Sequence, residues 1–423
     1  GRGCIVYPMK SHDTKWIQKD LLDRFLRYVQ IETTSDPHIE AIPSTPGQWD
    51  LLKLLKRELE EMGVEDVELD QHGYLIARIP ARGDRSGAPI IGFMAHVDTA
   101  SDVSGRVKPK VFEDYDGGEL EIGQGYRLSP EENSELRNYL GGTIITSDGS
   151  SLLGADDKAG VAEIMTAVRW IMEHPDFEHG TFEVIFTPDE ETGKGMNLFP
   201  KEKLTAACCY TFDGGARGEI EAECFNAYAA KIKFHGQVVH LGDARGKLVN
   251  ALTMASKYVS MLPQNEAPES TDGRFGYYAP IEMKAGLDEA ELTVFLRDFE
   301  QKSMEHRIEV LLTIAAAVEQ IYHGGKVEVE TKKVYSNMRD YISAEPKIME
   351  LLKKAIEAAG VDPLDTIIRG GTDGARLSEM GIPTPNVFAG GHNFHSRHEW
   401  AALQAMEEAT ETILNLIRLW SEE

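Results

Sequence analysis

The chain has 423 residues, which is too many for one hydrophobic core, so we expect two or three compact units. Its composition, 42% hydrophobic and 27% charged, is typical of a soluble globular protein. The formal net charge of −26 and the lack of a clustered basic stretch argue against nucleic acid or anionic lipid as a partner. No uninterrupted apolar run approaches the roughly 18 to 20 residues of a membrane span, so no membrane association is expected.

The cysteines predict a reducing compartment. They are Cys4, Cys208, Cys209 and Cys224. None forms a Cys-x-x-Cys pair, and the adjacent pair lies inside an apolar run, where cysteine usually acts as a small buried side chain. No disulfide framework is therefore expected, and a cytoplasmic location is predicted. Residues 1–8 contain only a short apolar patch before Met9, so we interpret them as an extension and leave them out of the fold prediction.

The first half of the chain alternates between helical patterns and short apolar runs. Helical spacing begins near Asp20, is interrupted by the polar stretch 32–46, and resumes up to Met62. An apolar helical pattern also covers 161–172. Short apolar or β-branched runs around it predict buried strands. These runs are residues 74–79, 90–95, 182–187 and 207–212. The alternation predicts an α/β sheet covered by helices.

The pattern of predicted helices and strands changes near Cys224. Strands and helices are predicted there in the order β-α-β-β-α-β, which is the ferredoxin-like unit. The predicted elements are strand 227–234, helix 246–261, strands 276–283 and 291–299, helix 303–322 and strand 326–332. After this unit the α/β texture returns, with predicted helices at 348–359 and 403–421.

Acidic residues and histidines follow the predicted strands in a pattern typical of a two-metal hydrolase. They are His96, Asp98, Asp156, Glu190, Glu191, Asp213 and His395. Five of them can form two tetrahedral sites that share one carboxylate, and two more can orient a ligand and move a proton. Each motif taken alone is also explained by ordinary structure, because acidic turns and surface histidines are common.

His96 and Asp98 come directly after the predicted strand 90–95. Because residues two apart in an extended chain face the same side, Asp98 can reach the His96 ring nitrogen that is not on the metal. This contact would fix the tautomer and the orientation of the imidazole. A His-x-Asp pair taken alone is more often a structural or surface feature.

Asp156 precedes a predicted helix and is the candidate for a carboxylate that bridges two cations, which then lie about 3.5–4 Å apart. Helix capping is the alternative reading, and Asp157 competes for that role. Glu190 and Glu191 follow a predicted strand, and their side chains diverge. One of them can ligate a metal while the other acts as general base, and the sequence does not say which.

Asp213 ends the predicted strand 207–212 and precedes two glycines. A carboxylate at such a strand end points into the crevice where open α/β sheets bind ligands, although Asp-Gly-Gly is equally natural as a turn. A later glycine-rich stretch offers His392, His395 and His398, among which periodicity cannot choose.

The position of these candidates predicts the domain organisation. Asp213 and His395 lie on opposite sides of the ferredoxin-like unit. If both bind the same pair of metals, that unit is an insertion whose first and last strands must emerge close together. We therefore predict a catalytic domain formed by residues 9–223 and 335–423, with an inserted domain at 224–334.

Three motifs together resemble the tripeptide aminopeptidases of the di-zinc metallopeptidase family that includes carboxypeptidase G and succinyl-diaminopimelate desuccinylase. The motifs are GADDKAG at 154–160, TPDEE at 187–191 and IRGGTDGA at 368–375. The similarity extends from about Leu22 to Ile417. It implies a discontinuous α/β catalytic domain with a mixed sheet flanked by helices, and an inserted ferredoxin-like α+β domain for a lid and for dimerisation.

The resemblance also implies two zinc ions per subunit. His96, Asp156 and Asp213 would hold one ion, and Asp156, Glu191 and His395 the other. In this family the C-terminal ligand histidine precedes a glutamate by four residues, which selects His395.

The resemblance assigns further roles outside the ligand set. Glu190 would be the general base toward a water bridging the metals, and Asp98 the orienting acid. His240 resembles a histidine that reaches the active site of a neighbouring subunit, so a homodimer through the inserted domain is implied. The residues expected to bind a short peptide substrate are Arg297, Arg369 and Asn337.

One departure from the family pattern follows His240. Leu241, Gly242 and Asp243 stand where the family usually has Pro-Gly and small residues, which bears on the lid geometry and the peptide preference. The predicted activity is hydrolysis of the N-terminal peptide bond of tripeptides. The alternatives are a related di-zinc amidohydrolase for dipeptides or N-acyl amino acids, and a binding protein without turnover. The spare Glu190 argues against a binding protein, because a structural zinc site keeps no open position.

Overall fold

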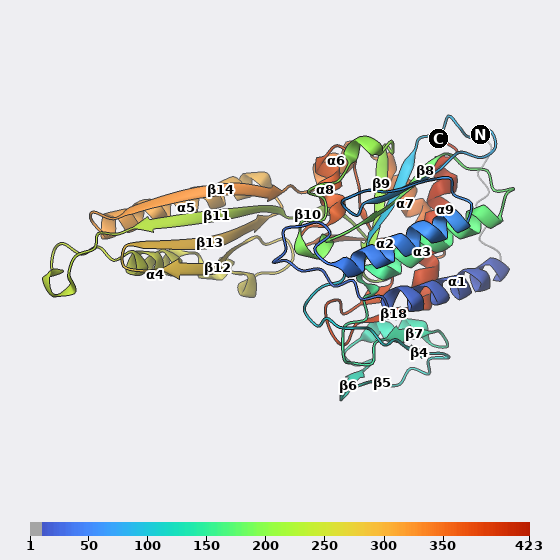
Figure 1. The fold of residues 1–423 in the computed structure, drawn as a ribbon, viewed down its shortest axis with the longest axis horizontal. Helices are drawn as coiled ribbons and strands as arrows, with labels where there is room; N and C mark the ends of the chain where they lie inside the picture. The colour runs from blue at the N-terminus through green and yellow to red at the C-terminus, as the bar shows by residue number, and fades with distance from the viewer. Residues whose placement is uncertain (1–10) are drawn as a thin grey trace. The chain divides into compact units, whose positions relative to one another are not determined.

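The computed structural model describes residues 11–423, so the predicted extension at 1–8 and Cys4 lie outside the described residues. The chain divides into two compact units (Figure 1). Unit 1 comprises the chain up to Ala222 together with Asp340–Thr366 and Thr372–Glu423, and unit 2 comprises Glu223–Arg339 and Ile367–Gly371. Within the described range, no helix has both the length and the apolar character needed to span a membrane.

Unit 1 is built on a mixed sheet with the strand order β1-β2-β8-β3-β9-β16-β10-β15. β3 pairs in parallel with β8 and β9, and β16 pairs in parallel with β9. The pairs β1-β2, β2-β8 and β10-β16 are antiparallel. The strands are β1 (Asp66–Leu69), β2 (Leu75–Ile79), β3 (Ile91–His96), β8 (Phe182–Thr187), β9 (Cys208–Gly214), β10 (Glu219–Cys224), β15 (Leu364–Ile368) and β16 (Asn386–Phe388). The predicted mixed sheet is confirmed.

Helices cover this sheet. α3 packs against α1, α9, β3 and β9, and α7 packs against α9. α2 contacts β1 and β2, while α8 contacts β9. The helices are α1 (Ser11–Val29), α2 (Pro46–Glu61), α3 (Ala155–Glu173), α6 (Arg339–Ser343), α7 (Lys347–Ala358), α8 (Asp373–Glu379) and α9 (Leu403–Trp420).

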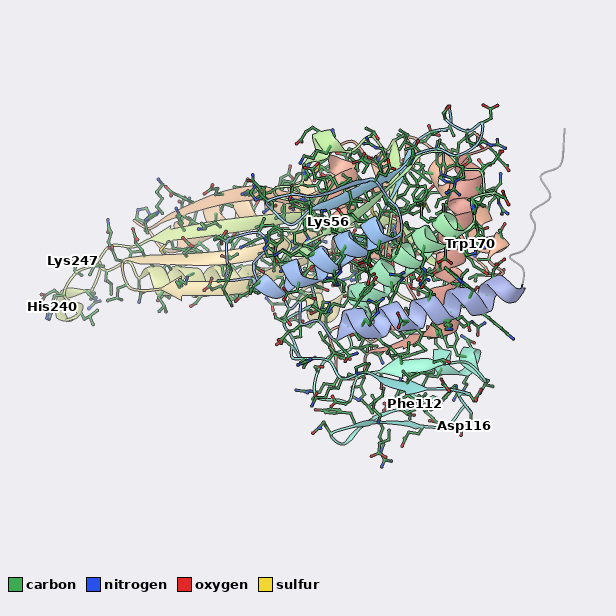
Figure 2. All side chains as sticks on the ribbon, turned by 45° about the vertical axis from the view of Figure 1, so that its right-hand side comes forward. Lys56, Phe112, Asp116, Trp170, His240 and Lys247 are labelled. Carbon is green, nitrogen blue, oxygen red and sulfur yellow. The ribbon has the colours of Figure 1, made fainter. Side chains whose placement is uncertain are left out.

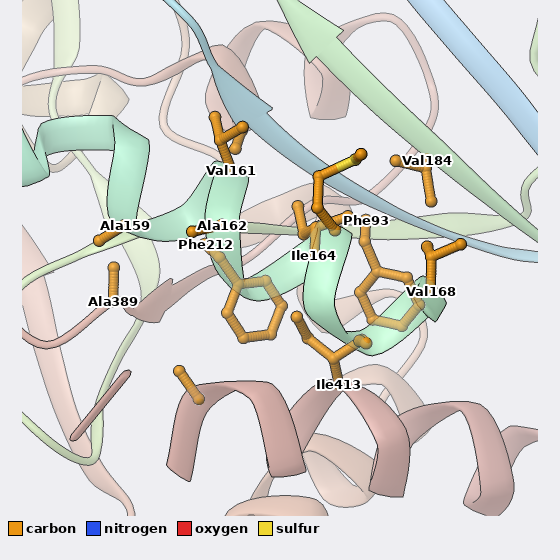
Figure 3. Packing of buried hydrophobic residues seen from close by; sticks show 14 of the residues in the cluster. Phe93, Ala159, Val161, Ala162, Ile164, Val168, Val184, Phe212, Ala389 and Ile413 are labelled. Carbon is orange, nitrogen blue, oxygen red and sulfur yellow. The ribbon is translucent and has the colours of Figure 1, made fainter. Parts of the chain in front are cut away.

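The main core of unit 1 lies between α3 and the central strands (Figure 3). Phe93 of β3 and Phe212 of β9 point toward Ile413 of α9, and Val161 and Val168 of α3 belong to the same cluster. β3 is apolar on both faces up to Ala95 because both faces are covered, and α3 is buried on nearly every side, including the polar Glu163 and Thr166. A Cβ on Gly160 would lie 2.0 Å from the carbonyl oxygen of Phe212, so glycine is what allows α3 to approach β9 this closely.

A smaller sheet with the order β17-β18-β7-β4 and a hairpin of β5 and β6 complete unit 1. Their core includes Tyr139 and Trp400, which pack edge to face. The strands are β4 (Lys110–Phe112), β5 (Leu120–Gly123), β6 (Tyr126–Leu128), β7 (Ile144–Thr146), β17 (Gly391–His392) and β18 (Trp400–Ala402). The sequence pattern did not predict these strands, because each is too short to show a period of two.

Unit 2 has the predicted element order and a sheet in which all neighbouring strands are antiparallel. The strand order is β12-β13-β11-β14, with α4 and α5 packed against the sheet. This is the ferredoxin-like arrangement. The elements are β11 (Asn226–His235), α4 (Ala251–Met261), β12 (Tyr277–Ala285), β13 (Glu289–Asp298), α5 (Gln301–Ile321) and β14 (Lys326–Tyr335).

Two boundaries differ from the sequence pattern for local reasons. α4 begins at Ala251 and not at residue 246, because the side chain of Asn250 accepts the N–H groups of Leu252 and Thr253 as an N-cap. The segment Ile367–Gly371 belongs to the compact unit 2, because Arg369 donates hydrogen bonds to carbonyl oxygens of the loop before β12.

Candidate metal centre

The candidate ligands of unit 1 gather where the central parallel strands end. β8, β3 and β9 are neighbours in the sheet, and the carboxyl ends of parallel strands meet at one edge. His96 ends β3, Glu190 and Glu191 follow β8, and Asp213 is the penultimate residue of β9. Asp156 in the first turn of α3 and His395 in the loop after β17 complete the group.

His96 directs one ring nitrogen at carboxylates and the other at Asp98. Its Nε2 lies 3.0 Å from Asp156 Oδ1, 3.3 Å from Asp213 Oδ1 and 3.6 Å from Glu190 Oε2. Its Nδ1 lies 2.9 Å from the carbonyl oxygen of Asp98 and 3.1 Å from Asp98 Oδ1. Both partners of Nδ1 are acceptors, so Nδ1 carries a proton, and a neutral imidazole in that tautomer would offer its Nε2 lone pair to a cation.

Asp98 joins the ends of two strands. Besides facing His96, its Oδ1 accepts the backbone N–H of Glu190 at 3.0 Å and its Oδ2 accepts that of Glu191 at 3.1 Å. The side chain is fully buried. Asp98 therefore fixes the imidazole and, at the same time, the turn that carries the two glutamates.

Asp156 lies between the two imidazoles. Its Oδ1 is 3.0 Å from His96 Nε2, and its Oδ2 is 3.0 Å from His395 Nε2. Glu191 Oε1 is 3.0 Å from the same His395 nitrogen. The ligand atoms of His96, Asp156 and Asp213, and those of Asp156, Glu191 and His395, each form a group whose atoms lie within 4.8 Å of one another. The two groups share Asp156.

The electrostatics of the centre reflect crowded, buried carboxylates. Burial and neighbouring carboxylates raise the pKa of Glu190 well above its usual value, that of Asp213 to about 8 and that of Glu191 to about 9. Burial also acts to raise the pKa of Asp156, but hydrogen bonds with His395 and His96 hold it well below its usual range. Hydrogen bonds that the His395 ring donates to Asp156 and Glu191 raise its pKa to about 11. Such a dense group of carboxylates favours the binding of cations.

The donor set fits two divalent cations. Two imidazoles, each giving up its Nε2 proton to a cation, and three carboxylates can supply each cation with three ligands while one carboxylate is shared. In both imidazoles, Nδ1 faces a further carboxylate. Asp98 contacts His96, and Oδ2 of Asp102 lies 3.4 Å from Nδ1 of His395. Such outer partners are typical of histidine ligands in metal sites.

Comparison with known proteins identifies the family. Residues 153–419, more than half of the chain, match the model of peptidase family M20/M25/M40. The chain belongs to this family. It is 44% identical over 409 residues to peptidase T of Geobacillus thermodenitrificans, a match that covers 96% of this chain and 99% of that protein. It is 45% identical over 405 residues to peptidase T of Clostridium perfringens, with 96% of this chain and 100% of that protein covered.

Solved structures share the fold of this M20 chain. The aminopeptidase PepT from Bacillus cereus has a TM-score of 0.75 at 24% identity, over 96% of this chain and 99% of that chain. A dinuclear metal-binding peptidase of the M20 family from Bacillus subtilis has a TM-score of 0.68 at 16% identity, over 96% of this chain and 99% of that chain. These likenesses confirm the α/β fold with an additional ferredoxin-like unit.

Two further residues support the centre without having been predicted from the sequence. Asp102 backs His395, and the carboxylate of Glu399 accepts backbone N–H groups next to Asp156. Burial raises the pKa of Glu399 to about 7. Asp102 lies in a loop four residues after Asp98. Because a loop has no regular spacing of side chains, the sequence did not predict its contact with His395. The spacing of Glu399 from His395 identified the histidine but predicted no contact for the glutamate itself.

The other predicted residues lie in unit 2. His240 is exposed on the loop between β11 and α4, where its Nδ1 accepts the N–H of Gly242 at 3.1 Å (Figure 2). Leu241 beside it is also exposed. Asp243 Oδ2 lies 4.0 Å from the His240 ring. The residues that replace Pro-Gly therefore form a short 3-10 turn, Leu241–Asp243, capped by the histidine itself.

Each of the three predicted substrate-binding residues has structural contacts within unit 2. Arg369 donates to the carbonyl oxygens of Gly273 at 2.6 Å and Phe275 at 2.8 Å. Arg297 donates to Leu296 O at 2.9 Å. The buried Asn337 is used most fully: it accepts the N–H groups of Cys224 at 3.1 Å and Arg339 at 3.0 Å, and donates to Phe299 O at 3.0 Å.

Proposed function

We propose that this chain is a di-metal aminopeptidase that hydrolyses the N-terminal peptide bond of tripeptides. The main support for the proposal is the position of Asp156. Its two carboxylate oxygens lie 3.0 Å from Nε2 of His96 and 3.0 Å from Nε2 of His395, and Glu190 lies next to His96. The relatives called peptidase T, which match over almost the full length of this chain, support the substrate class.

Zinc is the proposed metal, with two ions per subunit. His96, Asp156 and Asp213 would hold one ion, and Asp156, Glu191 and His395 the other. Mixed imidazole and carboxylate ligands suit zinc, although manganese or cobalt can bind the same donors. Metal analysis of the purified protein, followed by reconstitution of the stripped protein with each ion, tests both the identity and the number.

When bound, the two cations supply Lewis acidity, which polarises the scissile carbonyl and makes the attacking water more acidic. Glu190 takes a proton from that water as general base and returns it to the leaving amine. Asp98 keeps the His96 imidazole in the tautomer that leaves Nε2 free. His240 of a neighbouring subunit would donate a hydrogen bond to the oxygen that becomes negative in the transition state.

Arg297 and Arg369 are the proposed partners of the peptide's terminal carboxylate, because a planar guanidinium pairs well with that group. Asn337 belongs to the same proposed binding region. Arg369 already holds the loop before β12, so its substitution would disturb that loop as well. Arg297→Lys is therefore the cleaner probe, and KM for a tripeptide should rise while kcat changes less.

A homodimer through unit 2 is proposed, together with a cytoplasmic location. β12 presents a long exposed edge from Pro280 to Ala285, and Ile281 on this strand is exposed as an apolar side chain. Such an edge favours pairing with another chain. Cys208 and Cys209 are buried thiols outside any disulfide, which fits a reducing compartment. Sedimentation analysis measures the oligomeric state.

A substrate comparison tests the activity. A free tripeptide, its N-acetylated form, a dipeptide and an N-acyl amino acid are assayed with the same zinc-loaded protein. Rapid release of the first residue from the free tripeptide, with little turnover of the other three, is expected. Preferential hydrolysis of the dipeptide or the N-acyl amino acid would replace the proposal by the related amidohydrolase. No turnover of any of them would leave a binding protein.

A further inference from the structure

Glu399 ties together two segments of unit 1 that are far apart in the chain. It lies four residues after His395, directly before β18, and its side chain is buried. Its Oε1 accepts the backbone N–H groups of Leu153 at 2.8 Å and Gly154 at 2.7 Å. Its Oε2 accepts the N–H of Asp156 at 3.1 Å. One carboxylate thus serves three amides of the turn that leads into α3.

That turn depends on an outside acceptor. Gly154 has a φ of 85° and Asp156 has φ −82° and ψ 101°, so the backbone here is not helical. The N–H groups of the turn therefore cannot all find acceptors within a regular helix. A buried amide group without a hydrogen-bond partner lowers the stability of the folded state. The carboxylate of Glu399 supplies the partner for three such groups. The place of the Asp156 side chain follows from the path of this turn.

The loop that carries His395 also needs external support. His395 has a φ of 61° and Asn393 a φ of 56°, a region that residues other than glycine rarely adopt. Arg397 holds this loop by donating to the carbonyl oxygens of Gly149 at 3.0 Å and Ser150 at 2.9 Å. Arg397 and Glu399 therefore bind the loop to the same stretch, residues 149–156, through opposite kinds of backbone group.

We propose that Glu399 is a positioning residue. It holds the carboxylate of Asp156 and the imidazole of His395 in the relative position that lets one shared carboxylate bind both cations. The inference rests on the proposed function only in that the two residues hold metal. Its physical basis is that metal ligands bind most tightly when neighbouring groups fix them before the cation arrives. Glu399 touches neither substrate nor cation in this role.

Unit 1 offers a matched control for its loss. Glu183 is another buried carboxylate that clamps backbone amides, accepting the N–H groups of Thr205 at 2.8 Å and Ala206 at 2.5 Å. It lies on β8, and Arg78 donates to its other oxygen at 2.8 Å. Removing either carboxylate disturbs a buried backbone clamp, but only Glu399 clamps the turn that carries Asp156.

The experiment compares E399Q with E183Q as metal-free full-length proteins. Zinc binding is measured by competition with a chromophoric chelator, so catalysis is not needed for the readout. In E399Q the amide nitrogen would face the N–H of Asp156, and the affinity for at least one of the two ions should fall roughly 10 to 100-fold, as when an outer partner of a ligand is lost. E183Q should bind both ions as the wild type does. The melting temperature of each metal-free variant reports the general loss of stability.

The outcomes separate the explanations. Wild-type affinity in E399Q would overturn the positioning role, and so would an equal loss of affinity in both variants. If E399Q does not fold, R397Q removes the other tie of the loop from a more accessible position. R397Q should lower the affinity for one of the two zinc ions by about 10-fold. Unchanged zinc affinity in R397Q would overturn the inference as well. A wild-type protein that binds fewer than two ions would instead refute the metal assignment on which the inference rests.

Discussion

Glu190 and Glu191 are adjacent, yet they face different parts of the centre. Glu191 Oε1 lies 3.0 Å from His395 Nε2, whereas Glu190 Oε2 lies 3.6 Å from His96 Nε2. We expect Glu190→Gln to retain both cations and to lower kcat by about 10²-fold or more, because an amide cannot take the proton of the attacking water. Steady-state kinetics and metal analysis on the same preparation measure both quantities.

Glu202→Gln, at an exposed position of unit 1, is the control for this substitution and should behave as the wild type. Full turnover in Glu190→Gln would exclude it as the general base. Loss of one cation without loss of the other would make Glu190 a ligand in place of Glu191.

Glu221 gives a prediction on pH that is independent of the metal ligands. Burial raises the pKa of this carboxyl to about 7, although Asn386 donates a hydrogen bond to it at 2.5 Å. A carboxyl with a raised folded-state pKa adds stability below its unfolded pKa of about 4.5, and this contribution disappears as the pH rises through about 7. The free energy of unfolding of the wild type, relative to Glu221→Gln, should therefore fall between pH 4.5 and 8.

The expected size of that fall is roughly 1 to 3 kcal/mol, at about 1.4 kcal/mol for each pKa unit. Urea denaturation of both proteins at each pH measures it. Glu357→Gln, exposed on α7, is the matched control and should show no such pH dependence. A constant difference between wild type and Glu221→Gln across this range would contradict the prediction.

At the residue scale, strand ends made the candidates visible in the sequence. His96, Asp98 and Asp213 follow long buried strands, and such strand ends converge in an α/β sheet. The choice of His395 over its neighbouring histidines came from a resemblance, because a loop has no period. Glu399 could not be predicted as a clamp, since its partners are backbone amides 243 or more residues earlier in the chain.

Among the elements, the loop between β11 and α4 carries the next prediction. His240 is exposed there, as is Lys247 on the same loop (Figure 2). His240→Ala should leave zinc binding and oligomeric state unchanged and should lower kcat by about 10²-fold, the usual effect of losing one donor to a developing oxyanion. Kinetics on the zinc-loaded variant and sedimentation of the same sample measure the two effects.

Lys247→Ala is the control on this loop and should retain wild-type kcat. A monomeric wild type with full activity would refute the contribution of His240 from a neighbouring subunit. An equal loss of kcat in both loop variants would point to the mobility of the loop and not to the imidazole.

How well an element could be predicted depended on its length and burial. β8 was predicted with its observed bounds, and the long antiparallel strands of unit 2 within a few residues, because several consecutive apolar or alternating positions define them. The strands β4 to β7, and β15 to β18, were not predicted, since two to five residues carry too little pattern. Their positions depend on partners from distant parts of the chain, such as the pairing of β18 with β7.

For the whole molecule, the separation into units predicts a local effect of metal removal. The candidate ligands all belong to unit 1. A cation at 100 times its Kd stabilises the folded state that binds it by about 2.7 kcal/mol. Chelation should therefore speed hydrogen exchange in α3 and β9, whereas β11 and β13 of unit 2 should exchange at an unchanged rate. Exchange followed by mass spectrometry, with and without a chelator, resolves these segments.

Equal acceleration in both units would contradict this prediction, because it would mean that they open as one cooperative block. Unchanged exchange in both would argue against cations in the centre. Re-addition of zinc to the chelated sample should restore slow exchange in α3 and is the control for effects of the chelator itself.

The order in which the ligands occur along the chain has a consequence for biosynthesis. His96, Asp156, Glu191 and Asp213 leave the ribosome before unit 2, but His395 leaves after it. With the proposed ligand sets, a growing polypeptide can therefore assemble at most one complete cation pocket until translation has passed the ferredoxin-like insert. The proposed second ion, and with it the proposed cleavage of peptides, would have to wait until nearly the entire chain has been made.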